Sequence, residues 1–372
     1  MLLNYYSIVA AAIVGTASGI LSVKWLRARL RSGRIVARAA AVGFVSTLIL
    51  SGGALFITGL DGFTLVHVAY VVGTVGVPTA GGIVLLTARE RPRAITVVCV
   101  IALLAIPVGV YATYVEPFWL RADAAELGVD GVDGRIRIGV LSDLQTTAVG
   151  DYENDAVDRL LGFAPDIVVL PGDLYQFDGE LFDQRAPQFT QLIQRITDDV
   201  PFVYVVSGNT DTVAGLRHIT QGTGARVLDN EIVTFELNGT TLSIGGTTLF
   251  GDEAAARRMA ERLSGDEHAD VRILLAHKPD AIDLLQARPA DLLIAGHTHG
   301  GQVSFPLFGP PLTLSRVPRH VAAGGLHELN ETPIYVSTGV GRERGNAPQL
   351  RFGVRPSIGI IDLVGPEVPE GS

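Results

Sequence analysis

The feature that most constrains the fold of this chain is a set of long stretches without charged side chains in its first 115 residues. Four such stretches contain no Asp, Glu, Lys or Arg, and they are Met1–Val23, Ala39–Leu60, Gly62–Ala88 and Ala94–Val115. Each provides the roughly 20 apolar residues that a helix needs to cross the hydrocarbon core of a bilayer. The sequence therefore predicts a membrane anchor of four transmembrane helices within residues 1–115.

The distribution of basic residues gives this anchor an orientation. Residues 24–38 carry six Lys and Arg side chains and residues 89–93 carry three, whereas the connection around Asp61 carries none. Loops rich in Lys and Arg stay on the cytoplasmic side of a membrane. We therefore predict a multi-pass protein of the cell membrane, with everything after Val115 in an extracytoplasmic position.

Charge also separates the two parts of the chain. Residues 1–115 carry nine basic and two acidic side chains, against 20 basic and 36 acidic ones in the remainder. An acidic domain suits the phosphate backbone of nucleic acid poorly, so nucleic acid is excluded as a partner. The single cysteine, Cys99, excludes a disulfide framework and a cysteine-based zinc site. The sequence leaves the oligomeric state open.

Beyond the anchor, an acidic and glycine-containing linker at residues 116–134 leads into a different pattern. Short apolar runs predict strands at 135–141, 166–170, 202–206, 271–276, 291–295, 333–336 and 358–363. Helix-length segments lie at 154–161, 181–196 and 254–263, and residues 227–243 suggest antiparallel strands joined by an Asn-Gly turn. Strands that alternate with helices indicate an α/β domain built from βαβ units. We assign this domain to residues 135–372.

Residues with metal-ligating side chains follow five of the predicted strands. Asp143, Asp173 and Asn209 follow the first three, His277 follows the strand at 271–276, and the segment 297–299, His-Thr-His, follows the strand at 291–295. Ligands in α/β sheets bind beyond the carboxyl ends of the strands. Carboxylate oxygens and imidazole nitrogens without thiolates suit manganese, iron or zinc. Two adjacent ions of this kind can clamp a phosphoryl group and activate water.

The order of these residues resembles the calcineurin-like metallophosphoesterase superfamily, whose blocks read D-x-H, G-D, G-N-H-[DE], H and G-H-x-H. The segments LAHKPD at 275–280, AGHTHGGQV at 295–303 and RFGVRPSIGIIDL at 351–363 are similar to the bacterial membrane-associated branch. The resemblance covers roughly residues 135–365. It implies a four-layer αββα sandwich around two mixed sheets, and hydrolysis of phosphomonoesters, phosphodiesters or pyrophosphates.

The resemblance also implies two sets of metal ligands and a catalytic group. Asp143, Asp173 and His299 match the ligands of the first ion, and Asp173, Asn209, His277 and His297 match those of the second. Asp173 would bridge the two ions. Asp173, Asn209 and His297 are the expected catalytic residues, and the expected reaction is attack by a metal-activated hydroxide on phosphorus.

Two positions depart from the family pattern. Gln145 stands where the family has the histidine of D-x-H, and Thr210 stands where it has the histidine of G-N-H-[DE]. An amide oxygen can still ligate, but it is a weaker donor than imidazole, so Gln145 favours a harder ion such as manganese. Threonine cannot replace a general acid, whose loss typically costs about 10²–10⁴-fold in rate. Thr210 therefore favours substrates with an acidic leaving group, such as pyrophosphates.

Two features after the metal-binding histidines bear on the substrate. Arg316, Arg319 and His320 form either a basic patch for an anionic substrate or an ordinary stretch of surface loop. The loop at 305–317 is apolar yet rich in proline and glycine, so it either contacts a bilayer or acyl chain or packs over the core. An anchor raises the local concentration of membrane esters, which makes a lipid-linked substrate one candidate.

The sequence thus favours a membrane-anchored, two-metal phosphoesterase that acts on a phosphodiester, pyrophosphate or phosphomonoester, with the lipid bilayer as a further partner. The alternative is a weakened sensor on the same fold, which binds metal and phosphate but has lost catalysis at Gln145 and Thr210. A transporter is disfavoured because the anchor contains no buried charged pair.

Overall fold

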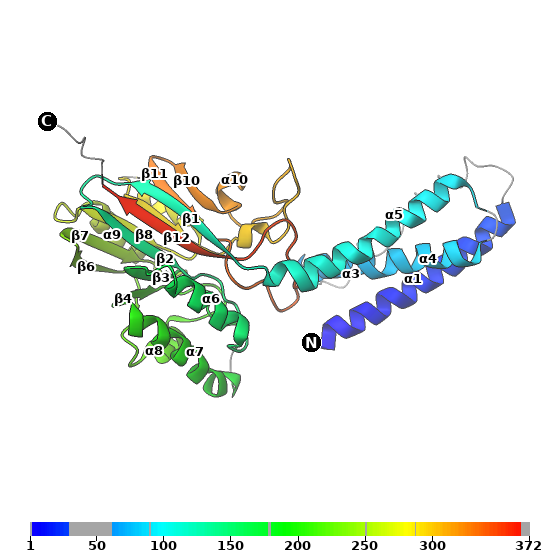
Figure 1. Cartoon of the computed structure of the whole chain (residues 1–372), viewed down its shortest axis with the longest axis horizontal. Helices are drawn as coiled ribbons and strands as arrows, with labels where there is room; N and C mark the ends of the chain where they lie inside the picture. Colours follow the sequence, from blue (N-terminus) through cyan, green and yellow to red (C-terminus); the bar gives the residue numbers. More distant parts are fainter. Residues whose placement is uncertain are drawn as a thin grey trace. The chain divides into compact units, whose positions relative to one another are not determined.

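The computed structural model describes residues 2–29, 62–88, 91–177, 180–249, 251–286 and 288–365. The chain divides into two compact units, and each is described by itself (Figure 1). The first unit consists of Met1–Val115 with Glu343–Gln349, and the second of Glu116–Arg342 with Leu350–Ser372.

The first unit is helical throughout its described N-terminal part. Its elements are α1 (Leu2–Arg29), α3 (Gly62–Val71), a π-helical segment (Val72–Gly76), α4 (Val77–Thr87), α5 (Arg93–Val110) and a second π-helical segment (Tyr111–Val115). Two continuous helical spans are long and apolar enough to cross a membrane, Gly62–Thr87 and Arg93–Phe118, and Val9–Trp25 is a shorter apolar helix. The helix predicted at residues 39–60 lies outside the described residues, so the four-helix anchor stays a prediction.

The second unit is built on two six-stranded sheets. The first sheet has the order β1 (Arg121–Gly128), β12 (Ser357–Val364), β2 (Arg135–Val140), β3 (Ile167–Leu170), β4 (Phe202–Val205) and β5 (Arg226–Val227). The second has the order β10 (Gly325–Leu329), β11 (Thr332–Val336), β9 (Leu292–Ala295), β8 (Val271–Leu275), β7 (Thr240–Gly246) and β6 (Glu231–Leu237). Both sheets are mixed, because β12 runs antiparallel to β2, and β6 and β10 run antiparallel to their neighbours.

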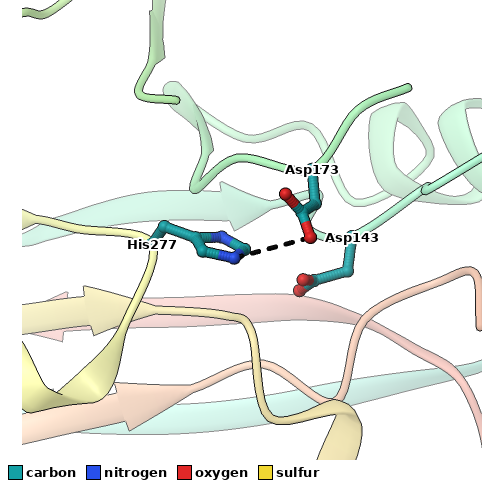
Figure 2. A group of neighbouring side chains, drawn as sticks. All are labelled: Asp143, Asp173 and His277. Atoms are coloured by element: carbon teal, nitrogen blue, oxygen red, sulfur yellow. Dashed lines mark ion pairs between the residues drawn. The ribbon is translucent and has the colours of Figure 1, made fainter. Parts of the chain in front are cut away.

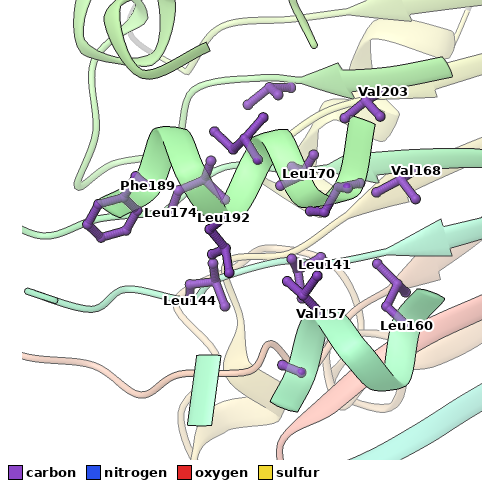
Figure 3. Close-up of a cluster of buried hydrophobic side chains, with 14 of the residues drawn as sticks. Leu141, Leu144, Val157, Leu160, Val168, Leu170, Leu174, Phe189, Leu192 and Val203 are labelled. Carbon is purple, nitrogen blue, oxygen red and sulfur yellow. The ribbon is translucent and has the colours of Figure 1, made fainter. Parts of the chain in front are cut away.

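Helices cover the outer face of each sheet. The helices of this unit are α6 (Asp151–Leu161), α7 (Glu180–Asp199), α8 (Val213–Thr220), α9 (Glu253–Ser264) and α10 (Arg319–Ala322), with 3₁₀ segments at Glu116–Phe118, Pro279–Leu285 and His299–Gly301. One buried cluster, part of which is drawn in Figure 3, joins β3, β4 and β12 to α6, α7 and α8. A second lies between the two sheets, and a third joins the other sheet to α9 and the 3₁₀ segment Pro279–Leu285. These layers confirm the αββα sandwich.

The sequence explains why the central strands occupy these positions. All four residues of β3, Ile-Val-Val-Leu, are buried, as are all four of β9, Leu-Leu-Ile-Ala. Strands covered on both faces lack polar alternation, because each face of the sheet contacts an apolar layer. The helices are amphipathic, and caps such as Asp252, which accepts hydrogen bonds from the backbone N–H groups of Ala254 and Ala255, fix where they begin.

The structure differs from the sequence prediction between residues 116 and 134. This segment was expected to be a linker, but residues Arg121–Gly128 form β1, which pairs in parallel with β12 along its whole length. The side chains of β1 are mostly exposed and include charged residues, as is usual for an edge strand. The pairing of β1 depends on backbone hydrogen bonds and not on apolar side chains. A search for apolar runs therefore did not predict this strand.

The close approach of the loops after β3 and β4 yields a test of the fold. Gly172 has φ +89°, and an added Cβ would lie 2.6 Å from the Gly208 nitrogen and 2.9 Å from Nδ1 of His277. We expect Gly172→Ala to lower the free energy of unfolding by about 3 kcal/mol, because it combines backbone strain with overpacking. Chemical unfolding of the purified chain measures the loss.

Gly222→Ala provides the matched control for this substitution. Gly222 has a similar φ of +81°, but no atom lies within 4 Å of the position of an added Cβ. The control should therefore show only the backbone cost, about 1 kcal/mol. Equal losses for the two variants would contradict a close approach of these loops.

Candidate metal centre

The candidate site is assembled where strands of both sheets end. Asp143 follows β2, Asp173 follows β3, Asn209 follows β4, His277 follows β8, and the segment 297–299 follows β9. The loops after β2 and β3 continue side by side, since the N–H of Asp143 donates to the Gly172 carbonyl (3.1 Å) and the N–H of Gln145 donates to the Asp173 carbonyl (2.8 Å). Residues that are far apart in the sequence are thereby brought to one place.

Two buried carboxylates and one imidazole form the centre of the site. Asp143, Asp173 and His277 each offer a ligand atom, and these atoms lie within 4.8 Å of one another (Figure 2). The distance from Nε2 of His277 to Oδ2 of Asp173 is 3.5 Å. The Asp143 carboxylate also accepts hydrogen bonds from the N–H of His297 and from the Ser142 hydroxyl. All three side chains point into the same small volume.

Asn209 and a second histidine extend this group. Oδ1 of Asn209 lies 3.0 Å from Nε2 of His277 and 2.9 Å from Nδ1 of His297. On the other side of its ring, Nδ1 of His277 lies 2.8 Å from the carbonyl oxygen of Pro171. A hydrogen bond from Nδ1 to this carbonyl leaves the lone pair of Nε2 directed at Asn209 and Asp173, which is the tautomer that a metal ligand needs.

His299 lies beside Asp143 and contacts a buried arginine. Nε2 of His299 is 3.7 Å from Oδ1 of Asp143, and Nδ1 is 3.2 Å from Nη2 of Arg351. Arg351 is fully buried and donates hydrogen bonds to the carbonyl oxygens of His299, Thr338, Gly339 and Gly341. Arg351 is a site residue that the sequence analysis missed, although it opens the segment RFGVRPSIGIIDL that carried the resemblance.

The backbone of the site is unusual because non-glycine residues adopt left-handed conformations. Asp143, Gln145, Asp173, His297 and His299 have φ values of +50°, +42°, +55°, +70° and +48°. Such conformations cost roughly 1 kcal/mol or more each and concentrate at functional sites. These residues lie in the loops that follow β2, β3 and β9, and the left-handed conformations let the chain turn sharply there.

Burial sets the charge state of the site. Burial and the negative charge of Asp173 raise the pKa of Asp143 well above its usual value. Burial lowers the pKa of His277, and burial together with the charge of Arg351 lowers that of His299 well below the usual value. Burial, with smaller effects of His277 and Lys278, lowers the pKa of His297 to about 3. The imidazoles are therefore neutral near pH 7, as metal ligands must be.

The two positions that depart from the family pattern have defined surroundings. Gln145 is fully buried, its N–H donates to the Asp173 carbonyl (2.8 Å), and its role as a metal ligand stays a prediction. The backbone N–H of Thr210 donates to Oδ1 of Asp173 (2.8 Å), and its hydroxyl donates to the Tyr175 carbonyl oxygen (2.8 Å). The hydroxyl proton of Thr210 is thus engaged with the backbone.

Asp211, which follows Thr210, connects two loops of the site through hydrogen bonds. Its buried carboxylate accepts hydrogen bonds from the N–H of Gly208 (2.6 Å) and the N–H of Leu174 (2.9 Å), so it joins the loops that carry Asn209 and Asp173. Burial, followed by the charge of Asp173, raises the pKa of Asp211 to about 7.

The three residues suggested as a basic patch have separate partners in the structure. Arg316 forms ion pairs with Asp280 (3.1 Å) and Asp283 (2.6 Å). The guanidinium of Arg319 lies 5.4 Å from the ring centroid of Phe308, and the ring of His320 lies 5.5 Å from that of His327. No described contact joins the three to one another, and their role in substrate binding stays a prediction.

The donor set fits divalent metal ions. Two carboxylates, an amide oxygen and three neutral imidazoles converge, with two of the imidazole rings 5.0 Å apart between centroids. Burying carboxylates close together is costly unless cations offset their charge. Hard oxygen donors mixed with imidazole nitrogen suit Mn²⁺, Fe or Zn²⁺.

Comparisons with known proteins identify the type of domain that contains this site. Residues 136–301 match the sequence model of the calcineurin-like phosphoesterase family. The phosphodiesterase YaeI of Escherichia coli is 28% identical over 263 residues, which cover 68% of this chain and 92% of YaeI. The uncharacterized metallophosphoesterase YkuE of Bacillus subtilis is 28% identical over 272 residues, which cover 68% of this chain and 88% of YkuE.

A third relative combines the domain with a membrane protein. The transmembrane protein with metallophosphoesterase domain of Bos taurus is 27% identical over 224 residues, which cover 55% of this chain and 48% of that protein. The match over residues 136–301 and these relatives support a calcineurin-like metallophosphoesterase domain in the second unit and indicate a metal-dependent phosphoester hydrolase.

The raised pKa of Asp211 predicts a pH-dependent stability in the chain without metal. The folded chain keeps a proton on Asp211 up to about pH 7, whereas the unfolded chain loses it near pH 3.8. The contribution of Asp211 to stability therefore falls as the pH rises through this interval. Asp211→Asn cannot titrate, so its stability relative to that of the wild type should rise by up to about 4 kcal/mol between pH 4 and pH 7.

Chemical unfolding of both chains in a chelator, at a series of pH values, measures this difference. The histidines with lowered pKa values act in the opposite direction, since their contribution to stability rises with pH, but they are common to both chains and cancel. Any loss of hydrogen bonds in the variant adds a constant offset. A difference that does not change with pH would contradict the prediction.

Proposed function

We propose that this chain is a membrane-anchored phosphoesterase with two metal ions, and that it hydrolyses a phosphodiester or pyrophosphate in preference to a simple alkyl phosphomonoester. The observation that carries the proposal is the convergence of Asp143, Asp173 and His277 within 4.8 Å. The phosphodiesterase YaeI among its relatives adds support for a diester substrate.

Two ligand sets follow from the arrangement around Asp173. Asp143 and His299, whose ligand atoms are 3.7 Å apart, would hold the first ion together with the buried Gln145, with manganese favoured because oxygen donors predominate in this set. Asn209, His277 and His297 would hold the second. Asp173 would bridge the two. When bound, such ions activate water and neutralise charge that develops on the phosphoryl oxygens.

The side chains of the site support the substrate preference. A general acid would have to donate a proton to the leaving oxygen, but the hydroxyl proton of Thr210 is directed at the Tyr175 carbonyl. Without that acid, the leaving group must carry its own negative charge. A phosphate or aryl oxide does this readily and an alkoxide does not, because the leaving-group pKa decides the need for proton transfer.

The apolar loop near the site supports a lipid-linked ester as substrate. Leu307, Phe308, Leu312 and Leu314 are exposed, which disagrees with the interpretation that the loop packs over the core. The carbonyl oxygen of Leu314 lies 3.3 Å from Nε2 of His297, so the loop borders the site directly. Exposed apolar side chains beside a polar site suit an acyl or isoprenoid chain carried by the substrate.

The apolar helical spans support the membrane part of the proposal. Gly62–Thr87 and Arg93–Phe118 satisfy the length and composition of transmembrane helices. Together with the predicted helices at residues 1–23 and 39–60, they would form a multi-pass anchor that places the metallophosphoesterase domain outside the cytoplasm, because the basic loops are retained inside.

Labelling of a single cysteine tests this orientation. The chain has one cysteine, Cys99, so Cys99→Ala with Glu328→Cys leaves one thiol at an exposed position of β10. We expect a membrane-impermeant maleimide to label this thiol in intact cells. Labelling that occurs only after the cells are opened would place the domain in the cytoplasm and contradict the proposed orientation.

Hydrolysis of bis(p-nitrophenyl) phosphate tests the proposed chemistry. The detergent-purified chain loaded with Mn²⁺ should hydrolyse this diester, and Asp173→Ala should lower kcat by about 10³-fold or more, because both ligand sets lose their shared carboxylate. The matched control is Asp183→Ala, which removes an exposed carboxylate on α7 and should leave activity unchanged.

Metal content measured on the same samples separates the outcomes. Two ions per chain in the wild type and a loss in Asp173→Ala agree with the proposal. A folded, metal-loaded chain that turns over neither this diester nor a pyrophosphate would support the alternative of a metal- and phosphate-binding sensor.

A further inference from the structure

A cavity of about 560 Å³ opens directly beside the metal centre. His277 is part of its wall, together with residues from the loop after β7, from α9 and from the 3₁₀ segment Pro279–Leu285. Its charged lining consists of the basic residues Arg257, Lys278 and Arg316 and the acidic residues Asp252, Glu253, Asp280 and Asp283. His277 is the candidate metal ligand that lines this cavity, so the cavity adjoins the metal centre at this residue.

The basic residues of the cavity differ in whether their charge is already matched. Arg257 pairs with Glu253 (3.3 Å). Arg316 pairs with Asp280 and Asp283, which also holds the loop after the metal-binding histidines in place. Lys278 has no ion pair with any acidic side chain in the described part of the chain. Lys278 is therefore the cation of this cavity that is available to an anionic ligand.

Lys278 lines the cavity next to the metal centre. Lys278 directly follows the candidate ligand His277 and is half-buried. Lys278 and His277 both line the cavity, so the positive charge of Lys278 belongs to the part of the wall that adjoins this candidate ligand.

A cation at this position can stabilise the leaving group of the reaction. Thr210 cannot protonate the leaving group, because its hydroxyl donates a hydrogen bond to the Tyr175 carbonyl oxygen. A leaving phosphate gains a negative charge when its bond to the reacting phosphorus breaks. An ammonium group beside it would offset that charge, and charge-assisted hydrogen bonds to phosphate are among the stronger polar interactions in proteins.

We propose that Lys278 binds the non-reacting phosphate of a pyrophosphate-type substrate, and that the cavity beside His277 receives the leaving half of the molecule. The proposal rests on the phosphoesterase activity proposed above and specifies its substrate class. In the reaction, water forms the new bond to phosphorus and the bridging P–O bond breaks. The electron pair of that bond stays on the leaving phosphate, and the protons of the water pass to solvent.

Two substrates that differ in the second phosphate test the proposal. UDP-glucose contains two phosphates joined by a bridging oxygen, so one phosphate is non-reacting whichever phosphorus is attacked. Bis(p-nitrophenyl) phosphate contains a single phosphate and therefore no non-reacting one. In the full-length chain with Mn²⁺, Lys278→Ala should lower kcat/KM for UDP-glucose about 10- to 100-fold, and that for the diester by less than about threefold. Lys278→Arg should retain most of the activity on UDP-glucose, because it keeps the positive charge.

Arg262→Ala is the matched control, since it removes one positive charge from an exposed position of α9 that does not line the cavity. It should leave both values unchanged. A binding measurement gives a second readout that does not depend on turnover. Calorimetric titration should show that Lys278→Ala weakens binding of methylenediphosphonate about 10-fold and leaves binding of methylphosphonate nearly unchanged.

The outcomes separate this proposal from the one on which it rests. If the wild type hydrolyses neither substrate, the proposed phosphoesterase activity fails. If the wild type hydrolyses the diester but not UDP-glucose, or if Lys278→Ala lowers both activities equally, the assignment of Lys278 is overturned while the phosphoesterase activity stands.

Discussion

The burial of two carboxylates beside each other is the constraint on which the rest of this site depends. Asp143 and Asp173 end neighbouring parallel strands, and both side chains are almost completely inaccessible to water. Their charges raise each other's energy in a poorly solvated place, so the ionised pair needs cations to be stable. The left-handed turns after the strands, the bracing carboxylate of Asp211 and the buried guanidinium of Arg351 all maintain this arrangement. The site is therefore built to hold positive charge.

Much of the second unit could be predicted from the sequence because its central strands are apolar on both faces. The run Asp-Ile-Val-Val-Leu before Pro171 and the run Asp-Leu-Leu-Ile-Ala before Gly296 mark β3 and β9 with little ambiguity, and a ligand residue follows each. Strand β1 escaped prediction because an edge strand is defined by backbone pairing, which a polar and half-exposed segment can provide equally well. Of the anchor, the described helices agree with the predicted stretches, and the segment 39–60 lies outside the described residues.

Side-chain partners were harder to predict than strand ends. The sequence suggested Arg316, Arg319 and His320 as either a basic patch for the substrate or an ordinary stretch of surface loop, and Lys278 was not among the candidates. The structure shows Arg316 between Asp280 and Asp283, which lie on the preceding 3₁₀ segment. Arg351 illustrates the same limit, because its role depends on carbonyl groups that the turn after β11 brings around it. The role of Thr210 could not be predicted for the same reason, because the hydrogen bond from its hydroxyl to the Tyr175 carbonyl is visible only in the structure.

Electron paramagnetic resonance of the Mn²⁺-loaded, full-length chain reports whether two ions occupy one site. Ions that share the Asp173 carboxylate interact magnetically, so we expect the spectrum of a spin-coupled pair in the wild type and its loss in Asp173→Ala. The spectrum of isolated Mn²⁺, with one ion per chain and no coupling at saturating metal, would show that Asp173 does not bridge two ions.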